Sequence, residues 1–185
     1  MVVNSYTCGC AIDHGQQSII ENNVFSGNAQ AIALWTDSIA HYPYPCINQS
    51  VASSVYTIRG NTFATSTDVL MLVNCSAIRV YNNAFRGGSS ANDNGGTSYS
   101  LHKPVAGKNI VGGSMMGGNY WQGETCAGSK VFGDPYRSAT MTASDSLPLC
   151  PPSKEVQRDR HALVLLELLG HVPFGRRPAQ HQKSE

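Results

Sequence analysis

The chain has 185 residues, of which 41% are hydrophobic and 14% are charged, and its formal net charge is +1. The length is sufficient for one domain with a hydrophobic core. A nearly balanced charge gives no general attraction to nucleic acid or to an anionic membrane, and no apolar run is long enough for a membrane-spanning helix. We therefore expect no nucleic-acid partner and no membrane span.

A six-residue phrase occurs three times, as Ile20–Phe25, Ile58–Phe63 and Val80–Phe85. Each copy has a β-branched residue, a variable residue, Asn or Gly, Asn, a smaller residue and Phe. The phenylalanines are separated by 38 and then by 22 residues, and repeats of roughly 20 residues or more are typical of stacked solenoids. Many glycines and few charges also favour a tightly turning β structure over a helical bundle. The repeat predicts an all-β, right-handed parallel β-helix of about four rungs.

Within each phrase, the β-branched residue and the Phe are expected to point inward and to stack on their equivalents one rung away. The Asn suits a sharp corner, because its short amide side chain bonds nearby backbone and tolerates turn geometry. The predicted structural ladder consists of Asn23, Asn61, Asn83, Phe25, Phe63 and Phe85. The chemically mixed position between them is expected to form a solvent-facing column and binding face of Glu21, Arg59 and Tyr81.

Two longer intervals between the phrases are expected to be loops inserted into the rungs. The first spans Thr36 to Ser53, and the second spans Gly87 to Gly107 and is rich in Gly, Ser and Asn, a composition typical of a flexible excursion. A looser fourth copy of the phrase is expected at Asn109–Met116. Insertions on one side of a solenoid often form its binding face.

The repeat pattern ends near Met116, so we expect rungs over residues 1–116, a non-repeating C-terminal cap over 117–152 and a tail over 153–185. The tail combines helix-forming residues with a basic end and is expected to be helical or disordered. The residues expected to close the last rung are Tyr120, Trp121, Asp134 and Tyr136.

Six cysteines precede the tail, and an even number in a Gly-rich β protein favours disulfides and an oxidising compartment. Cys126 with Cys150 is the preferred pair, because both flank the irregular cap; buried, reduced thiols are the alternative. The chain begins in rung-like sequence without a capping unit. We therefore expect it to be the C-terminal part of a longer protein that is extracellular, on the cell surface or periplasmic, with its signal missing here.

The order of four motifs indicates a family. Asn109-Ile110-Val111-Gly112-Gly113, Gly117-Gly118-Asn119-Tyr120-Trp121, Gly133-Asp134-Pro135-Tyr136 and Leu147-Pro148-Leu149 together resemble the C-terminal signature of NosD-like right-handed β-helix proteins. The rungs before it resemble the repeat that those proteins share with pectin-lyase-like proteins. The resemblance covers residues 1–152 and implies an extracytoplasmic β-helix; the family is associated with copper-site assembly.

Where the family has an acidic segment suited to calcium, residues 122–130 contain Glu124 as their one acidic residue. A hard cation needs several oxygen ligands, so we expect no metal there and expect the cysteine to replace it as a staple. Cys8, Cys10 and His14 offer soft ligands for copper, but the remaining His and Cys residues are scattered. We expect no metal site and no cofactor.

Two functions remain open. The first is a non-catalytic extracytoplasmic scaffold or carbohydrate-binding module, which presents its face to an extended glycan or a protein partner. The alternative is a polysaccharide lyase or glycoside hydrolase, or a fragment of one, and a glycosidase needs two carboxyl groups several ångströms apart. Glu21 and Arg59 are the nearest candidates for catalysis, although a surface salt bridge explains them equally well.

Overall fold

The computed structural model describes residues 1–36, 52–64, 68–87, 91–93, 99–123, 136 and 141–151. Their strands form three parallel sheets and one short antiparallel pair, and none of these residues lies in a helix. The described part of the chain is therefore all-β with parallel sheets, as the repeat predicts. The expected helical or disordered tail, residues 153–185, lies outside the described residues.

Each parallel sheet contains strands that are far apart in the sequence. Sheet A contains β1 (Val2–Val3), β4 (Val24–Ser26), β7 (Thr62–Ala64), β10 (Ala84–Arg86) and β15 (Tyr120–Trp121). Sheet B contains β2 (Cys8–Asp13), β5 (Gln30–Trp35), β8 (Asp68–Val73) and β11 (Ala91–Asp93). Sheet C contains β3 (Ile19–Glu21), β6 (Thr57–Arg59), β9 (Ile78–Tyr81) and β12 (Tyr99–Ser100). The antiparallel pair joins β13 (Val105–Ala106) to β14 (Met115–Met116).

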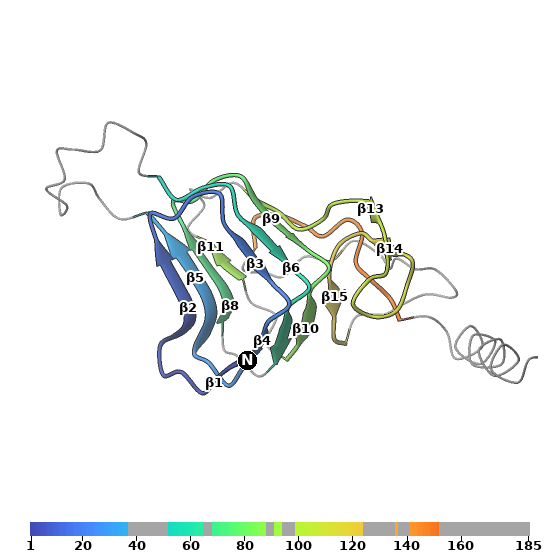
Figure 1. Ribbon diagram of the computed structural model, residues 1–185, viewed down its shortest axis with the longest axis horizontal. Coiled ribbons are helices and arrows are strands. Elements are labelled where there is room, and N and C mark those ends of the chain that lie inside the picture. Colours follow the sequence, from blue (N-terminus) through green and yellow to red (C-terminus); the bar gives the residue numbers. More distant parts are fainter. Residues whose placement is uncertain are drawn as a thin grey trace, which may run out of the picture. The chain divides into compact units, whose positions relative to one another are not determined.

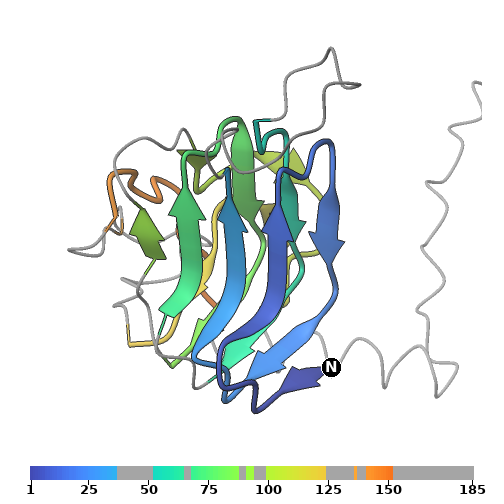
Figure 2. The same cartoon turned by 90° about the vertical axis from the view of Figure 1, so that its left-hand side faces the viewer.

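The chain visits the three sheets in a constant order, from sheet B to sheet C to sheet A, as Figure 1 shows. It does so through β2, β3 and β4, then through β5, β6 and β7, and then through β8, β9 and β10. The strands of sheet B lie side by side in Figure 2, with the same direction along their lengths. Such parallel strands are joined by long connections instead of hairpins, and here each connection passes through the other two sheets.

The strand register aligns the three copies of the repeated phrase. Ile20 pairs with Ile58, which pairs with Val80, in sheet C. In sheet A, Phe25 pairs with Phe63, which pairs with Phe85. Equivalent positions in successive copies are therefore cross-strand neighbours, about 4.8 Å apart between strands.

The corner between sheet C and sheet A explains why each phrase has Asn or Gly before its ladder asparagine. Asn22, Gly60 and Asn82 have φ angles of 58°, 66° and 56°. This left-handed conformation is open to Gly and is tolerated by Asn better than by other residues. The corner therefore selects the residue types of the phrase, independently of any function.

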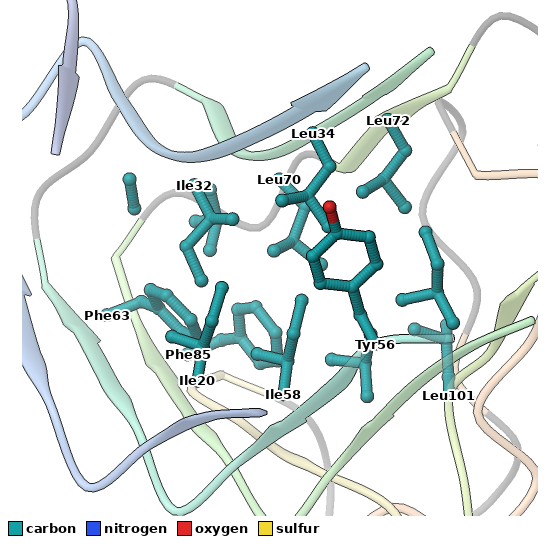
Figure 3. Close-up of a cluster of buried hydrophobic side chains, with 14 of the residues drawn as sticks. Ile20, Ile32, Leu34, Tyr56, Ile58, Phe63, Leu70, Leu72, Phe85 and Leu101 are labelled. Atoms are coloured by element: carbon teal, nitrogen blue, oxygen red, sulfur yellow. The ribbon is translucent and has the colours of Figure 1, made fainter. Parts of the chain in front are cut away.

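The three sheets enclose one hydrophobic core, which Figure 3 shows in close-up. Ile20, Ile58 and Leu101 face Ile32 and Leu70 from opposite sides of this core. Nearly all of the core side chains are fully buried, and burial of each large aliphatic or aromatic side chain stabilises the fold by roughly 1.5–3 kcal/mol. The core therefore accounts for the apolar positions of the repeated phrase and of the strands in sheet B.

Two expectations about the last circuit are wrong. Met116 pairs antiparallel with Val105, so residues 109–116 are not the fourth copy of the phrase, whereas Trp121 pairs with Phe85 in sheet A. The segment expected to be a flexible excursion between Gly87 and Gly107 contains β11 and β12, which extend sheets B and C. In both segments, pairing with strands of the preceding turn of the chain determines where the strands form. This pairing outweighs a local composition that favours turns.

Candidate functional site

The predicted binding face lies on the outer side of sheet C, and its first two members form an ion pair. Arg59 Nε and Nη2 each lie 2.7 Å from Glu21 Oε2, and both side chains are 40% exposed. Hydrogen bonds to Glu21 and then to Tyr81 raise the pKa of the Arg59 guanidinium. The structure therefore brings Glu21, Arg59 and Tyr81 together in one connected row.

Tyr81 departs from the expectation of a solvent-facing column. Its side chain is on the outer side of the sheet, because the neighbouring Val80 points into the core, yet Tyr81 is only 3% exposed. The ammonium group of Lys103 lies 5.7 Å from the centre of its ring. The chain beyond β12 thus covers this position, and the expectation that Tyr81 is exposed is wrong.

The ladder asparagines form one directional chain of hydrogen bonds. Asn61 Oδ1 accepts from the main-chain N and the Nδ2 of Asn23, at 2.9 and 3.3 Å. Asn83 Oδ1 accepts from the same two groups of Asn61, both at 3.0 Å. Asn119 Oδ1 accepts in the same way from Asn83, at 3.2 and 2.9 Å. Each ladder asparagine therefore donates from its side-chain amide to the next one on the C-terminal side.

A buried carboxylate ends this chain of amides. Asp145 is 0% exposed, and its Oδ2 accepts from the main-chain N of Asn119 at 2.7 Å and from Trp121 Nε1 at 2.8 Å. Its Oδ1 accepts from the main-chain N of Leu147 at 3.1 Å. Burial raises the pKa of Asp145, and the bonds from Asn119, Trp121 and Leu147 oppose that rise. Within the described residues, the Asp145 carboxyl group is thus held by N–H donors from Asn119, Trp121 and Leu147.

Sequence reasoning missed Asn119 and Asp145 as members of the ladder. Asn119 carries a usable signal, since Gly118-Asn119-Tyr120-Trp121 keeps the corner Gly, the Asn and the aromatic residue of the phrase. No sequence signal identifies Asp145, because its position next to Asn119 depends on the path of the chain after Trp121. The approach is close: a Cβ on Gly118 would overlap the Asp145 carboxylate, so a glycine is required there.

The aromatic residues of the phrase and of the predicted cap form a single stack. Ring centres are 5.4 Å apart for Phe25 and Phe63, 5.0 Å for Phe63 and Phe85, and 4.1 Å for Phe85 and Trp121. Tyr136 continues the stack 4.3 Å beyond Trp121. Offset aromatic pairs at such spacings add about 0.5–1.5 kcal/mol each beyond their buried area. The stack is therefore a structural element of the core and of its C-terminal closure.

The other cap residues divide between the surface and the part of the chain that is not described. Tyr120 is partly exposed, with the Arg86 guanidinium 5.5 Å from its ring centre. Asp134 lies outside the described residues. Trp121 belongs to β15, so sheet A extends beyond the predicted end of the rungs at residue 116.

Three of the cysteines carry reduced thiols, namely Cys8, Cys10 and Cys75. Burial raises the pKa of each of them, which keeps them protonated and poorly nucleophilic near neutral pH. Cys150 is buried, whereas its predicted partner Cys126 lies outside the described residues. The pairing of Cys126 with Cys150 therefore stays a prediction.

Comparison with known proteins gives one family. The model of the family described as periplasmic copper-binding protein (NosD) matches residues 1–126. No curated protein and no solved structure matches the chain significantly. The matched region contains the three copies of the repeated phrase, the four asparagines of the ladder and all of the strands in the three parallel sheets. The chain is a member of the NosD family.

Proposed function

We propose that the protein is an extracytoplasmic right-handed parallel β-helix of about four rungs that serves as a non-catalytic scaffold. In this proposal its outer face binds an extended glycan or a protein partner. The observation that carries it is the internal use of the polar groups: the corner amides bond one another, and Glu21 bonds Arg59. Such groups stabilise a rigid surface and are not arranged for chemistry.

The positions of the carboxylates favour binding over hydrolysis. A glycosidase needs two carboxyl groups on opposite sides of one bond, roughly 5–9.5 Å apart. Within the described residues, Glu21 is the one carboxylate on sheet C, whereas Asp13, Asp68 and Asp93 belong to strands of sheet B. Glu21 is already neutralised by Arg59. The lyase or hydrolase alternative has no specific observation in its favour here.

The family description names copper, and the described residues of this chain offer few suitable donors for it. Copper(I) prefers thiolate and thioether sulfurs, and the described residues contain no group of three or more His, Cys, Asp or Glu that could hold a metal ion. The Cys8 thiol donates to Gln30 Oε1 at 2.9 Å, and Gln30 Nε2 donates to the Met71 sulfur at 3.2 Å. The side-chain amide of Gln30 thus hydrogen-bonds to the sulfur atoms of both Cys8 and Met71. The described residues do not fit a copper site, and no step of the proposal uses copper.

The family description as periplasmic supports the extracytoplasmic location. Among the described residues, no helix has the length and apolar character needed to cross a lipid bilayer. We propose that the protein acts in the periplasm or at the cell exterior; a tagged protein recovered from the periplasmic or secreted fraction supports this, and recovery with cytoplasmic markers contradicts it.

A panel of polysaccharides tests the function itself. The protein is incubated with neutral and acidic polysaccharides, binding is followed by affinity electrophoresis, and products are followed as new reducing ends or unsaturated sugars. Binding without products supports the proposal. Products that disappear in Glu21→Gln or Arg59→Gln would establish the catalytic alternative.

A further inference from the structure

The charged side chains of the described residues are unevenly distributed around the solenoid. Their five cations are Arg59, Arg79, Arg86, Lys103 and Lys108. None of these belongs to sheet B, whose strands carry Asp13, Asp68 and Asp93. Within the described residues, the Lys and Arg side chains thus lie away from the sheet that carries three of the carboxylates.

The carboxylates and the Lys and Arg side chains also differ in how their charges are compensated. Asp93 Oδ2 accepts from Tyr99 Oη at 2.8 Å and from the main-chain N of Thr142 at 3.0 Å. Asp145 is held by buried donors, and Glu21 is held by Arg59. In contrast, within the described residues Arg59 is the one Lys or Arg that forms an ion pair with a carboxylate. The positive charge is therefore available to an external anion.

Arg79 lies within strand β9, which pairs with a strand on each side. It is exposed on the outer side of β9, since Ile78 and Val80 on either side of it are buried. Cross-strand pairing places Thr57 next to it on one side and Ser100 on the other. A guanidinium group between two hydroxyl groups is suited to a ligand that offers both carboxylates and hydroxyls, because Arg binds carboxylates through two parallel bonds.

The neighbouring row completes the surface. Arg59 pairs with Tyr81 two positions along the same strands, and the ammonium group of Lys103 lies over the Tyr81 ring. We define the basic face as the outer side of sheet C at Arg79 together with the neighbouring Lys103; Arg59, in the adjacent row, is paired with Glu21. Strands in a sheet repeat about every 4.8 Å, so this face presents polar groups at regular intervals along the solenoid.

We propose that the basic face binds an acidic polysaccharide, which is a linear chain of repeating carboxylates and hydroxyls. This inference rests on the proposed function and names its ligand class. The face is less suited to a membrane surface, because Ile19 is the one strongly exposed apolar side chain on the described strands of sheet C. Peripheral membrane binding requires buried apolar area in addition to positive charge.

The test uses polygalacturonate as the probe, with binding measured by calorimetry at low and at physiological salt. We expect Arg79→Gln and Lys103→Gln each to weaken binding about tenfold, the effect of losing roughly 1.4 kcal/mol from a charge-assisted contact. Arg86→Gln is the matched control, because it removes an equal charge from an exposed side chain in sheet A. Unchanged thermal unfolding of all three variants shows that the fold is intact.

Three further probes decide the ligand class, namely a neutral β-glucan, polyglutamate and vesicles of anionic phospholipid. Tighter binding of polyglutamate or vesicles overturns the proposal, and so does equal weakening by Arg86→Gln, which indicates unspecific charge attraction. Absence of binding to polygalacturonate also overturns it. Binding of the neutral glucan alone overturns the proposal that the basic face binds an acidic polysaccharide and leaves the proposed function intact. Cleavage of any polysaccharide overturns the proposed function.

Discussion

The main-chain N–H of Asn119 donates to the carboxylate of Asp145 across 2.7 Å, and this contact joins the C-terminal end of the asparagine ladder to the segment around Asp145. Upstream of Asn119, each ladder amide donates to the next one. Hydrogen bonds of this kind polarise one another in a low-dielectric interior. The ladder and the C-terminal closure are therefore one structural unit.

The ladder predicts unequal costs for removing its members. Asn83→Ala leaves the buried main-chain N of Asn61 without its acceptor and removes the three hydrogen bonds that Asn83 Nδ2 donates. Buried unpaired donors cost about 1–3 kcal/mol each, so we expect the free energy of unfolding in urea to fall by about 3 kcal/mol or more. Asn23→Ala is the control, since Asn23 is partly exposed and its side chain ends the ladder; we expect a loss below about 1.5 kcal/mol. Equal losses would show that the ladder does not act as a chain.

The raised pKa of Asp145 predicts a specific dependence on pH. Between the ordinary aspartate pKa of about 3.9 and the raised one, the folded protein binds more protons than the unfolded protein. The contribution of Asp145 to stability is therefore complete below the ordinary pKa and is lost as pH rises through the raised pKa. One group changes the free energy of unfolding by at most about 1.4 kcal/mol per pH unit.

Asp145→Asn isolates this effect, because the amide does not titrate. We expect the stability of the natural protein relative to the variant to decrease as pH rises through this window, as measured by urea unfolding at several pH values. A difference that is constant with pH, or that increases, would contradict burial as the dominant influence on this carboxyl group.

The Glu21–Arg59 pair is predicted to contribute little to stability. Both side chains are 40% exposed, and exposed ion pairs contribute at most about 1 kcal/mol. A double-mutant cycle with Glu21→Gln and Arg59→Gln should give a coupling energy below that value, and added salt should reduce it. A coupling that is much larger and insensitive to salt would assign the pair a role in the fold.

The cysteines predict a single disulfide attached to the closing segment. Because Cys8, Cys10 and Cys75 carry reduced thiols, Cys150 has only Cys46 and Cys126 as further candidates within the chain, and we predict Cys126. Peptide mapping of unreduced protein by mass spectrometry should recover a linked Cys126–Cys150 peptide, with Cys8, Cys10 and Cys75 alkylated after unfolding. A linked peptide that contains Cys46 would show that the pairing is wrong.

The parts of the site that sequence predicts are those that lie within the repeat. Glu21 and Arg59 occupy equivalent positions in two copies, so strand register alone brings them together. Tyr81 occupies the same position in the third copy, but the chain around Lys103 covers it. Exposure at an equivalent position depends on neighbouring segments that do not repeat.

The amino-acid sequence by itself determined the parallel all-β architecture, because residue types that suit a core strand and a left-handed corner recur at the same places in each copy. Only the tertiary structure decided where the last strands of the parallel sheets lie and that Asp145 ends the ladder. The physical reason is that stacking of equivalent residues follows a one-dimensional pattern. The return of Asp145 to Asn119 and the burial of Tyr81 depend instead on the paths of insertions, which no periodicity encodes.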